Sequence, residues 1–498
     1  MTTASCQTLK CRNFDSWLKH QNTKTHEVNF FLLSTSLIAS APSNAIGVDG
    51  PSALRLDPVS LLVLIVTLCA FCAPVFVLFP PFPPRKSDAL RETHTKLGLD
   101  PSRSNLRDHW KIDHASSSAK PGIKSLFIYP VKSCKGIEVT TAKVVPTGLE
   151  FDRLFTFAQL KSPFPVAVGE HHHGAKEEKQ EEEKGHHVWD FITQRQFPLL
   201  ATVEVELWQP DLDKMRGKTL SVRSGEAFLV LRFPWRGSGV SGVLETLAAK
   251  CLRGISAQPE KEVVLPVAAP TEGGIREKGY EYEGVRVWRD TTTALNVGSE
   301  LPEELSLYLG VSNKLGLFRM NPENLREVFR CAPKKDEVGY QPVVSFQDSY
   351  PVHILSLASV RDLESKVPKD EVLRELNPRR FRANIYVTGC PAYDEDSWKR
   401  IRFVDPSRQG DESTFHVSCR TTRCKLPNVN PDTGIRHPVE PDKSLRAFRE
   451  IDEGAPKTGC LGMQCTPLFE KVEALENQLT VGMPLEVLER GEHFFKKV

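Results

Sequence analysis

The stretch RCKLPNVNPDTG, residues 423–434, decides how the fold and chemistry of this 498-residue sequence are interpreted. It places Cys424 among basic neighbours, directly before a turn indicated by residues 430–434. Asn and Asp favour turns through local side-chain bonds, and Gly accepts the positive φ that many turns need. Basic surroundings favour a thiolate, which is a soft ligand for a transition metal. The stretch therefore predicts a metal-binding thiol on a strand end or loop, against the plainer interpretation of a half-buried structural cysteine.

Three further blocks share strand-like sequence with embedded polar residues. They are IYPVKSCKG (128–136), TQRQFPLL (193–200) and RANIYVTGC (382–390), the last followed by YDEDSW (393–398). Together with residues 423–434, these blocks occur in the order seen in the MOSC domain family. The sequence most closely resembles that family's amidoxime-reducing molybdenum proteins of the mitochondrial outer membrane.

Short runs rich in Val, Phe and Leu, separated by turn residues, dominate the sequence after residue 124. They predict a mainly β fold of the α+β class, with peripheral helices at 301–309, 357–367 and 442–449. The resemblance implies an N-terminal β-barrel domain and a C-terminal, barrel-like MOSC domain, preceded by a single transmembrane helix. The expected divisions are a poorly structured segment (1–58), a transmembrane anchor (59–79), a linker (80–123), the barrel domain (124–300) and the MOSC domain (301–498).

Residues 59–79 form an uncharged run of 21 residues, VSLLVLIVTLCAFCAPVFVLF. A helix of about 20 apolar residues crosses the hydrocarbon core of a bilayer, so the run predicts a membrane span, with a buried core helix as the alternative. Residues 35–58 contain one basic residue and residues 80–100 contain four. This asymmetry places the C-terminal side in the cytosol, as a single-pass anchor. The resemblance makes the mitochondrial outer membrane the expected address.

Residues 161–187 interrupt the predicted barrel with a run of Glu and Lys. Such a run cannot bury apolar surface, so a disordered insertion is expected. The histidine clusters at 171–173 and 186–187 could bind a metal, although nothing in the sequence fixes their geometry. The twelve cysteines are scattered through a long chain, which favours a reducing compartment over a disulfide framework.

The resemblance implies a molybdenum–molybdopterin cofactor, with Cys424 as the metal ligand and catalytic residue. Arg is the side chain best suited to bidentate contacts with phosphate, and an Asn in an apolar strand is costly unless it is bonded. Tyr350 departs from the small hydroxyl residue of the family, which leaves its role open. The cofactor contacts implied by the resemblance are Lys132, Ser133, Arg153, Ser349, Tyr350, Arg382, Asn384 and Arg423.

The family resemblance also implies a reaction and its partners. The protein would reduce N-hydroxylated small molecules such as amidoximes, with electrons passed from NADH through a cytochrome b5 reductase and cytochrome b5. The net charge of +2 gives no case for nucleic acid, and no haem or flavin segment is evident, so electrons must come from separate proteins. Two alternatives stay open. One is a molybdenum-cofactor binding or carrier protein of the sulfurase C-terminal type; the other is a non-enzymatic scaffold with zinc held by the Cys419/Cys424 and Cys460/Cys465 pairs.

Overall fold

The computed structural model describes residues 57–78, 85–111, 120–162, 187–216, 225–405, 412–470 and 475–495. The chain divides into two compact units, Met1–Pro80 and Pro81–Val498. The described part of the first unit is one helix, α1 (Pro58–Leu78), which has no acidic residue in its first turn and no basic residue in its last. Across the described residues, no helix combines the length and apolar character needed to cross a membrane, so the predicted span is not confirmed. The predictions for residues 1–56, and for most of 161–187, lie outside the described residues.

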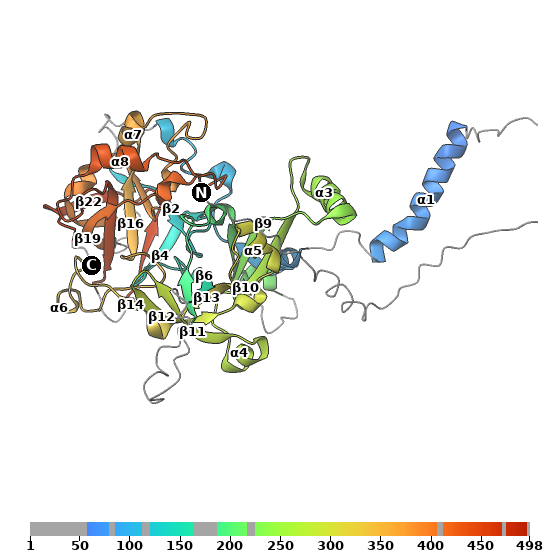
Figure 1. The fold of residues 1–498 in the computed structure, drawn as a ribbon, viewed down its shortest axis with the longest axis horizontal. Helices are drawn as coiled ribbons and strands as arrows, with labels where there is room; N and C mark the ends of the chain where they lie inside the picture. Colours follow the sequence, from blue (N-terminus) through green and yellow to red (C-terminus); the bar gives the residue numbers. More distant parts are fainter. Residues whose placement is uncertain are drawn as a thin grey trace, which may run out of the picture. The chain divides into compact units, whose positions relative to one another are not determined.

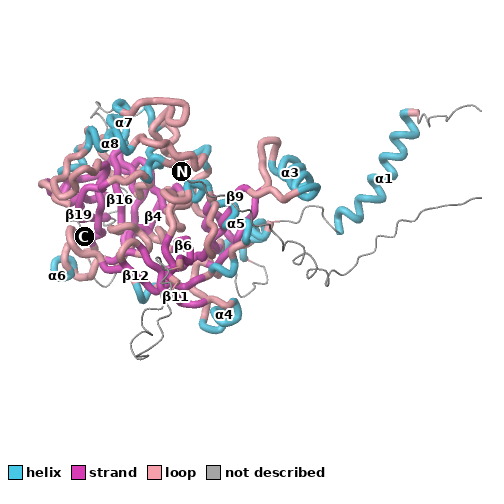
Figure 2. The backbone as a smooth tube through the Cα atoms, in the orientation of Figure 1, coloured by secondary structure: helices cyan, strands magenta, loops and turns pink. Residues whose placement is uncertain are grey.

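The second unit is mainly β, as predicted, and contains a closed five-stranded barrel (Figures 1 and 2). Residues alternate along its strands; in EYEGVRV of β11, for example, Val285 and Val287 are buried and Arg286 is not. This period of two places one face of each strand against the apolar interior. Neighbouring strands are antiparallel except for β7 and β11, whose parallel pairing closes the barrel. In spatial order the strands are β11 (Glu281–Val287), β12 (Asp290–Asn296), β13 (Leu315–Met320), β6 (Phe155–Lys161) and β7 (Val188–Phe191).

An eight-stranded sheet forms the other large layer of this unit. Its first two strands in sequence, β2 and β3, come from the N-terminal half of the chain, so strands from both sides of residue 300 share one sheet. Helices α7 (Leu357–Lys366) and α8 (Asp442–Arg449) pack on each other and on this sheet, close to their predicted positions (Figure 1). In spatial order the strands are β22 (Leu485–Arg490), β18 (Trp398–Val404), β19 (Glu412–Thr422), β20 (Cys460–Leu468), β16 (Val352–Ser356), β17 (Ile385–Thr388), β2 (Gly122–Ile128) and β3 (Ile137–Val139).

Three smaller sheets and further helices complete the unit. The four-stranded sheet contains β1 (His94–Lys96), β8 (Glu204–Pro210), β9 (Phe228–Pro234) and β10 (Glu260–Pro266). The others pair β21 (Asn477–Thr480), β4 (Thr141–Val145) and β5 (Gly148–Leu149), and β14 (Arg326–Glu327) with β15 (Val343–Val344). The remaining α-helices are α2 (Leu212–Met215), α3 (Gly239–Arg253), α4 (Glu272–Lys278), α5 (Glu303–Leu309) and α6 (Lys335–Val338).

Residues 85–111 belong to the folded unit, although the sequence predicted a linker there. Strand β1 pairs with β8 in an antiparallel register, and the side chain of His94 is buried. Arg85 forms an ion pair with Glu260 in which the nitrogen and oxygen are 2.5 Å apart. Pairing of backbone groups and burial of His94 hold this polar stretch in place, and composition alone does not reveal them.

Candidate functional site

A cavity of about 580 Å³ lies among loops of the barrel and strand ends of the eight-stranded sheet. Nine Lys or Arg side chains and two Asp side chains line it, so its wall is strongly basic. The structure brings together in this wall every residue that the sequence predicted for the site. They are Lys132, Ser133, Arg153, Ser349, Tyr350, Arg382, Asn384, Arg423 and Cys424. Their roles stay predictions.

Cys424 is positioned by the end of β19 and by the turn after it. The strand ends at Thr422, and the Cys424 side chain is exposed in the cavity wall. The predicted turn is present, because the amides of Asp432 and Thr433 donate to Asn430 Oδ1 at 2.9 and 3.3 Å. Gly434 has a φ of 68°, which a residue without a Cβ adopts readily. Among the described residues that line the cavity, Cys424 therefore offers one accessible thiol, between a strand end and a fixed turn.

Lys132 lies in the loop between β2 and β3, with its side chain buried. Its Nζ donates to the Phe346 carbonyl at 2.5 Å and to Asp348 Oδ1 at 2.6 Å. Burial lowers the pKa of Lys132 to about 8, although Asp348 opposes the shift. Burial by itself would raise the pKa of Asp348, but the charge and hydrogen bond of Lys132, together with Trp288 and Arg195, hold that pKa well below its usual range. The Asp348 side chain is 55% exposed, so solvent screens the pair and we assign it a positioning role rather than a large stabilisation.

Arg153 and Arg382 both contact the ring of the buried Tyr129. Their guanidinium carbons lie 4.5 and 4.2 Å from the ring centroid. Both residues have positive φ, 50° and 54°, a conformation that costs free energy and that occurs often at functional sites. Arg382 Nη1 donates to the Cys134 carbonyl at 2.7 Å, whereas its Nη2 is buried without a protein partner. Burial lowers the pKa of Arg382, and an anion at Nη2 would relieve the cost.

Asn384 is bonded by the protein itself. Its Oδ1 accepts from the His353 amide at 3.1 Å, and its Nδ2 donates to the Phe127 carbonyl at 3.2 Å. These bonds tie β17 to β16 and β2, so a backbone network satisfies the buried amide that the sequence marked as costly. The side chain still lines the cavity and fixes the neighbouring main chain.

The remaining predicted residues differ in exposure. Arg423 is buried, and its Nη2 donates to the Phe381 carbonyl at 2.8 Å. Burial lowers the pKa of Arg423. Ser349 is exposed in the cavity wall. The Tyr350 hydroxyl accepts from the Cys331 amide at 3.3 Å, and the residue packs in a cluster with Cys419.

The sequence did not indicate several residues of this wall. His353 is buried, its Nε2 has no protein partner, and burial holds its pKa well below the usual range, so the ring is neutral. Its only sequence signal is a lone His in the apolar run VHIL. Arg195, Trp288 and Arg326 line the cavity from the barrel side. Their place depends on how the barrel folds against the sheet.

The zinc alternative is not supported by the thiols. Cys419, Cys460 and Cys465 are buried in the core, whereas Cys424 is exposed in the cavity. Burial raises the pKa of Cys460 to about 12, which favours a thiol over a metal-binding thiolate there. Within the described part of the chain, no three His, Cys, Asp or Glu side chains gather closely enough to hold a metal ion.

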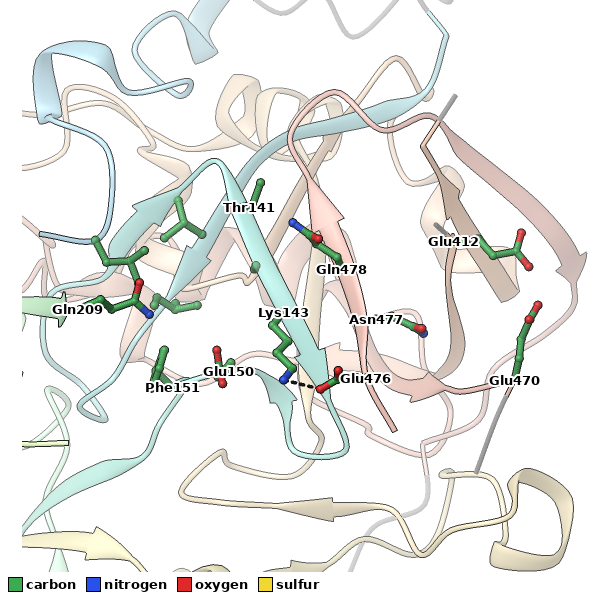
Figure 3. Close-up of a pocket in the computed structure, with 14 residues that line it drawn as sticks. Thr141, Lys143, Glu150, Phe151, Gln209, Glu412, Glu470, Glu476, Asn477 and Gln478 are labelled. Carbon is green, nitrogen blue, oxygen red and sulfur yellow. Dashed lines mark ion pairs between the residues drawn. The ribbon is translucent and has the colours of Figure 1, made fainter. Parts of the chain in front are cut away.

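A second cavity, of about 630 Å³, lies elsewhere in the same unit (Figure 3). One Lys and four Glu side chains line it, and Lys143 forms an ion pair with Glu476. A hydrogen bond with Glu470 is the main cause of the raised pKa of Glu412. This wall contains no cysteine and offers one cation that already has a partner, so it does not suit an anionic cofactor.

Comparison with known proteins finds family matches for two segments of the folded unit. Residues 341–486 match the family model described as MOSC domain, and residues 120–230 match the MOSC N-terminal beta barrel domain. Mitochondrial amidoxime-reducing component 1 from Homo sapiens is 27% identical over 373 residues, which are 74% of this chain and 82% of that protein. The Mus musculus protein of that name is 26% identical over 374 residues, with the same shares. Mitochondrial amidoxime reducing component 2 from Rattus norvegicus is 25% identical over 368 residues, 73% and 82% of the two chains.

Proposed function

Since this chain carries a MOSC domain preceded by a MOSC N-terminal beta barrel domain, we propose that it is a molybdenum-cofactor oxidoreductase that reduces N-hydroxylated small molecules such as amidoximes. One observation carries the proposal: an accessible thiol, Cys424, shares a cavity wall with nine basic side chains. The names of the relatives, which refer to amidoxime reduction, support the same reaction class.

The residues of the cavity fit an anionic pterin cofactor. Arg382 Nη2 is a buried polar atom without a protein partner, and a bound anion would satisfy it. Such orphaned groups are rare in folded proteins and call for an explanation. Lys132, Ser133, Arg153 and Arg423 would bind the phosphate and pterin, and Cys424 would bind the metal.

When bound, the cofactor supplies two-electron redox chemistry at molybdenum. The chain's own contribution is to hold and shield the site. The stacked Arg153 and Arg382 keep two positive charges close together, which favours an anion between protein and solvent. The turn at 430–434 fixes backbone that follows Cys424, whose thiol would bind the metal.

The electron donor and the membrane attachment are further parts of the proposal. We assign electron supply to cytochrome b5 and its NADH-dependent reductase, because this chain shows no motif for a redox group of its own. We also propose that residues 59–79 anchor the protein in the mitochondrial outer membrane with the MOSC domain in the cytosol. The uncharged 21-residue run, its basic C-terminal flank and the mitochondrial relatives support this address.

Metal analysis of the purified protein, paired with an amidoxime turnover assay, tests the proposal. We expect about one molybdenum and one pterin per chain, and reduction of benzamidoxime when cytochrome b5, its reductase and NADH are supplied. Molybdenum without turnover would favour the carrier function. Zinc in place of molybdenum would promote the scaffold and end the proposal.

A further inference from the structure

The β11–β12 hairpin places a tryptophan at the cavity in a conformation that such a residue rarely adopts. Val287 pairs with Asp290, so Trp288 and Arg289 form a two-residue turn. Trp288 has a φ of 60° and lines the cavity. Turns of this length favour Gly, Asn or Asp where φ is positive, because a bulky side chain clashes with its own backbone. A large aromatic residue is therefore the wrong choice for the turn alone.

Three contacts hold the indole ring in one orientation. Its Nε1 donates to Asp348 Oδ1 at 3.1 Å, the same oxygen that accepts from Lys132. The guanidinium carbon of Arg195 lies 4.3 Å from the ring centroid, and the Phe191 ring meets it nearly edge-on with centroids 5.0 Å apart. The ring is thus fixed by Arg195 and Phe191 on one side, and on the other by Asp348, which also pairs with Lys132.

These contacts leave much of Trp288 uncovered. The residue is 44% exposed, whereas Trp189 and Trp398 elsewhere in the folded unit are 5% and 0% exposed. A strained backbone, a fixed ring and an open surface in a cavity together point to binding rather than to packing. The basic partner Arg195 adds a positive charge beside the ring, which disfavours cationic ligands and accepts neutral or anionic ones.

We propose that Trp288 is a specificity-determining residue against which planar, conjugated N-hydroxylated substrates stack. The inference rests on the proposed reductase function and narrows its substrate class to aromatic amidoximes and related flat, uncharged molecules. Aromatic rings gain free energy from offset or edge contacts beyond the burial of their surface. Aliphatic amidoximes lack such a face and lose nothing when the indole is removed.

Steady-state kinetics on the full-length, cofactor-loaded protein test this assignment. In Trp288→Gly we expect the KM for benzamidoxime to rise about tenfold, which corresponds to ~1.4 kcal/mol. Acetamidoxime serves as the aliphatic comparison substrate. Its KM, and the kcat for benzamidoxime and for acetamidoxime, should stay near the wild-type values. Trp288→Phe should restore most of the benzamidoxime affinity. Trp110→Phe is the matched control, since Trp110 is 54% exposed but does not line the cavity.

A structural role predicts different results. Glycine suits the positive φ of the turn, so Trp288→Gly should leave the thermal midpoint of unfolding nearly unchanged. A large drop in that midpoint, or an equal change in KM for the two amidoximes, would overturn the assignment.

A binding measurement separates this inference from the proposed function. Benzamidoxime should quench tryptophan fluorescence in the wild type and in Trp110→Phe, and the quenching should be lost in Trp288→Phe. If the wild type reduces neither amidoxime, the proposed function fails, and the quenching result still decides the role of Trp288. Quenching that persists in Trp288→Phe would refute the inference even in an active enzyme.

Discussion

The cavity with Cys424 and the cavity with Lys143 have similar volumes, about 580 and 630 Å³, and opposite chemistry. Nine basic and two acidic side chains line the cavity with Cys424, whereas one basic and four acidic side chains line the other. The cavities also differ in how the charges are satisfied. Arg382 is half-buried and its buried Nη2 has no protein partner, while Lys143 is exposed and paired with Glu476 (Figure 3). Volume therefore does not identify the site, and unpaired buried charge does.

The contrast has a physical meaning for stability. Clustered cations repel one another, and positive φ at Ser133, Arg153, Arg382 and Trp288 adds local strain to the same wall. Among the described residues that line the acidic cavity, one residue other than glycine, Phe151, has a positive φ, of 65°. We infer that the basic cavity is held ready for an anion at some cost to the fold, and each prediction below uses this difference.

The largest effect is expected at the thiol. Cys424→Ser should reduce amidoxime turnover to the assay background, because a hydroxyl is a poor ligand for a soft metal. The fold should persist, since the side chain is exposed and the change is nearly isosteric. Cys251→Ser is the matched control, as Cys251 is also exposed but does not line the cavity. Equal loss of activity in the two variants would mean that Cys424 has no special role.

The next effect concerns cofactor retention. Arg382→Ala should weaken binding of the cofactor by about 10- to 100-fold, the range expected for loss of hydrogen bonds to a charged group. Molybdenum and pterin content after purification measures the change without a turnover assay. Lys143→Ala, in the acidic cavity, should retain wild-type content. If both variants keep their cofactor, the basic wall does not bind it.

Sequence reasoning succeeded where a residue is tied to a local pattern. The turn at 430–434, the helices near α5, α7 and α8, and the mainly β class follow from residue types and spacing. The residues that the family resemblance named for the site all line one cavity, and those in the quoted blocks lie at strand ends or turns. Local patterns thus locate side chains along an element even when the partners of that element are unknown.

The sequence did not predict which strands pair with one another across long separations in the chain. The sequence predicted that residues 124–139 belong to the barrel domain. In the structure, β2 pairs with β17 in the eight-stranded sheet. Periodicity indicates a strand but does not name its neighbour. Helix α3 was not predicted, because Gly239 and Gly242 in its first turn weaken helical propensity. Trp288 and His353 joined the site only through tertiary folding, so no local motif marked them.

Measuring cofactor affinity and stability across a pH series should show a further difference between the basic and the acidic cavity. The pKa of Lys132 is lowered to about 8 from 10.5, so its charge is lost as pH rises through 8. Cofactor affinity should therefore fall above pH 8, up to about tenfold per pH unit for one essential charge. Between pH 8 and 10.5 the unfolded chain binds more protons at this residue than the folded one. The contribution of Lys132 to the free energy of unfolding should thus rise with pH over that window.

Lys132→Met should remove both trends, as measured by cofactor retention and by denaturant unfolding across the series. Lys143→Met should alter neither in this window, because the pKa of Lys143 is raised by its bond to Glu476 rather than lowered. A wild-type cofactor affinity that stays constant from pH 7 to 10 would contradict the assignment of Lys132 to the anion.

The smallest effect is expected from the tract between β6 and β7. Lys161 pairs with Val188 in the barrel register, so the two ends of the tract are adjacent and a short linker can join them. Replacing residues 163–186 by six Gly and Ser residues shortens the connection fourfold, which should raise the free energy of unfolding by about 1 kcal/mol. Turnover should be unchanged, because described residues of the barrel and of the eight-stranded sheet build the wall that contains Cys424 and Trp288. Denaturant unfolding and benzamidoxime kinetics check the two expectations. Loss of soluble protein on this deletion would show that the Glu- and His-rich tract contributes to folding, and loss of turnover alone would show that it contributes to the basic cavity.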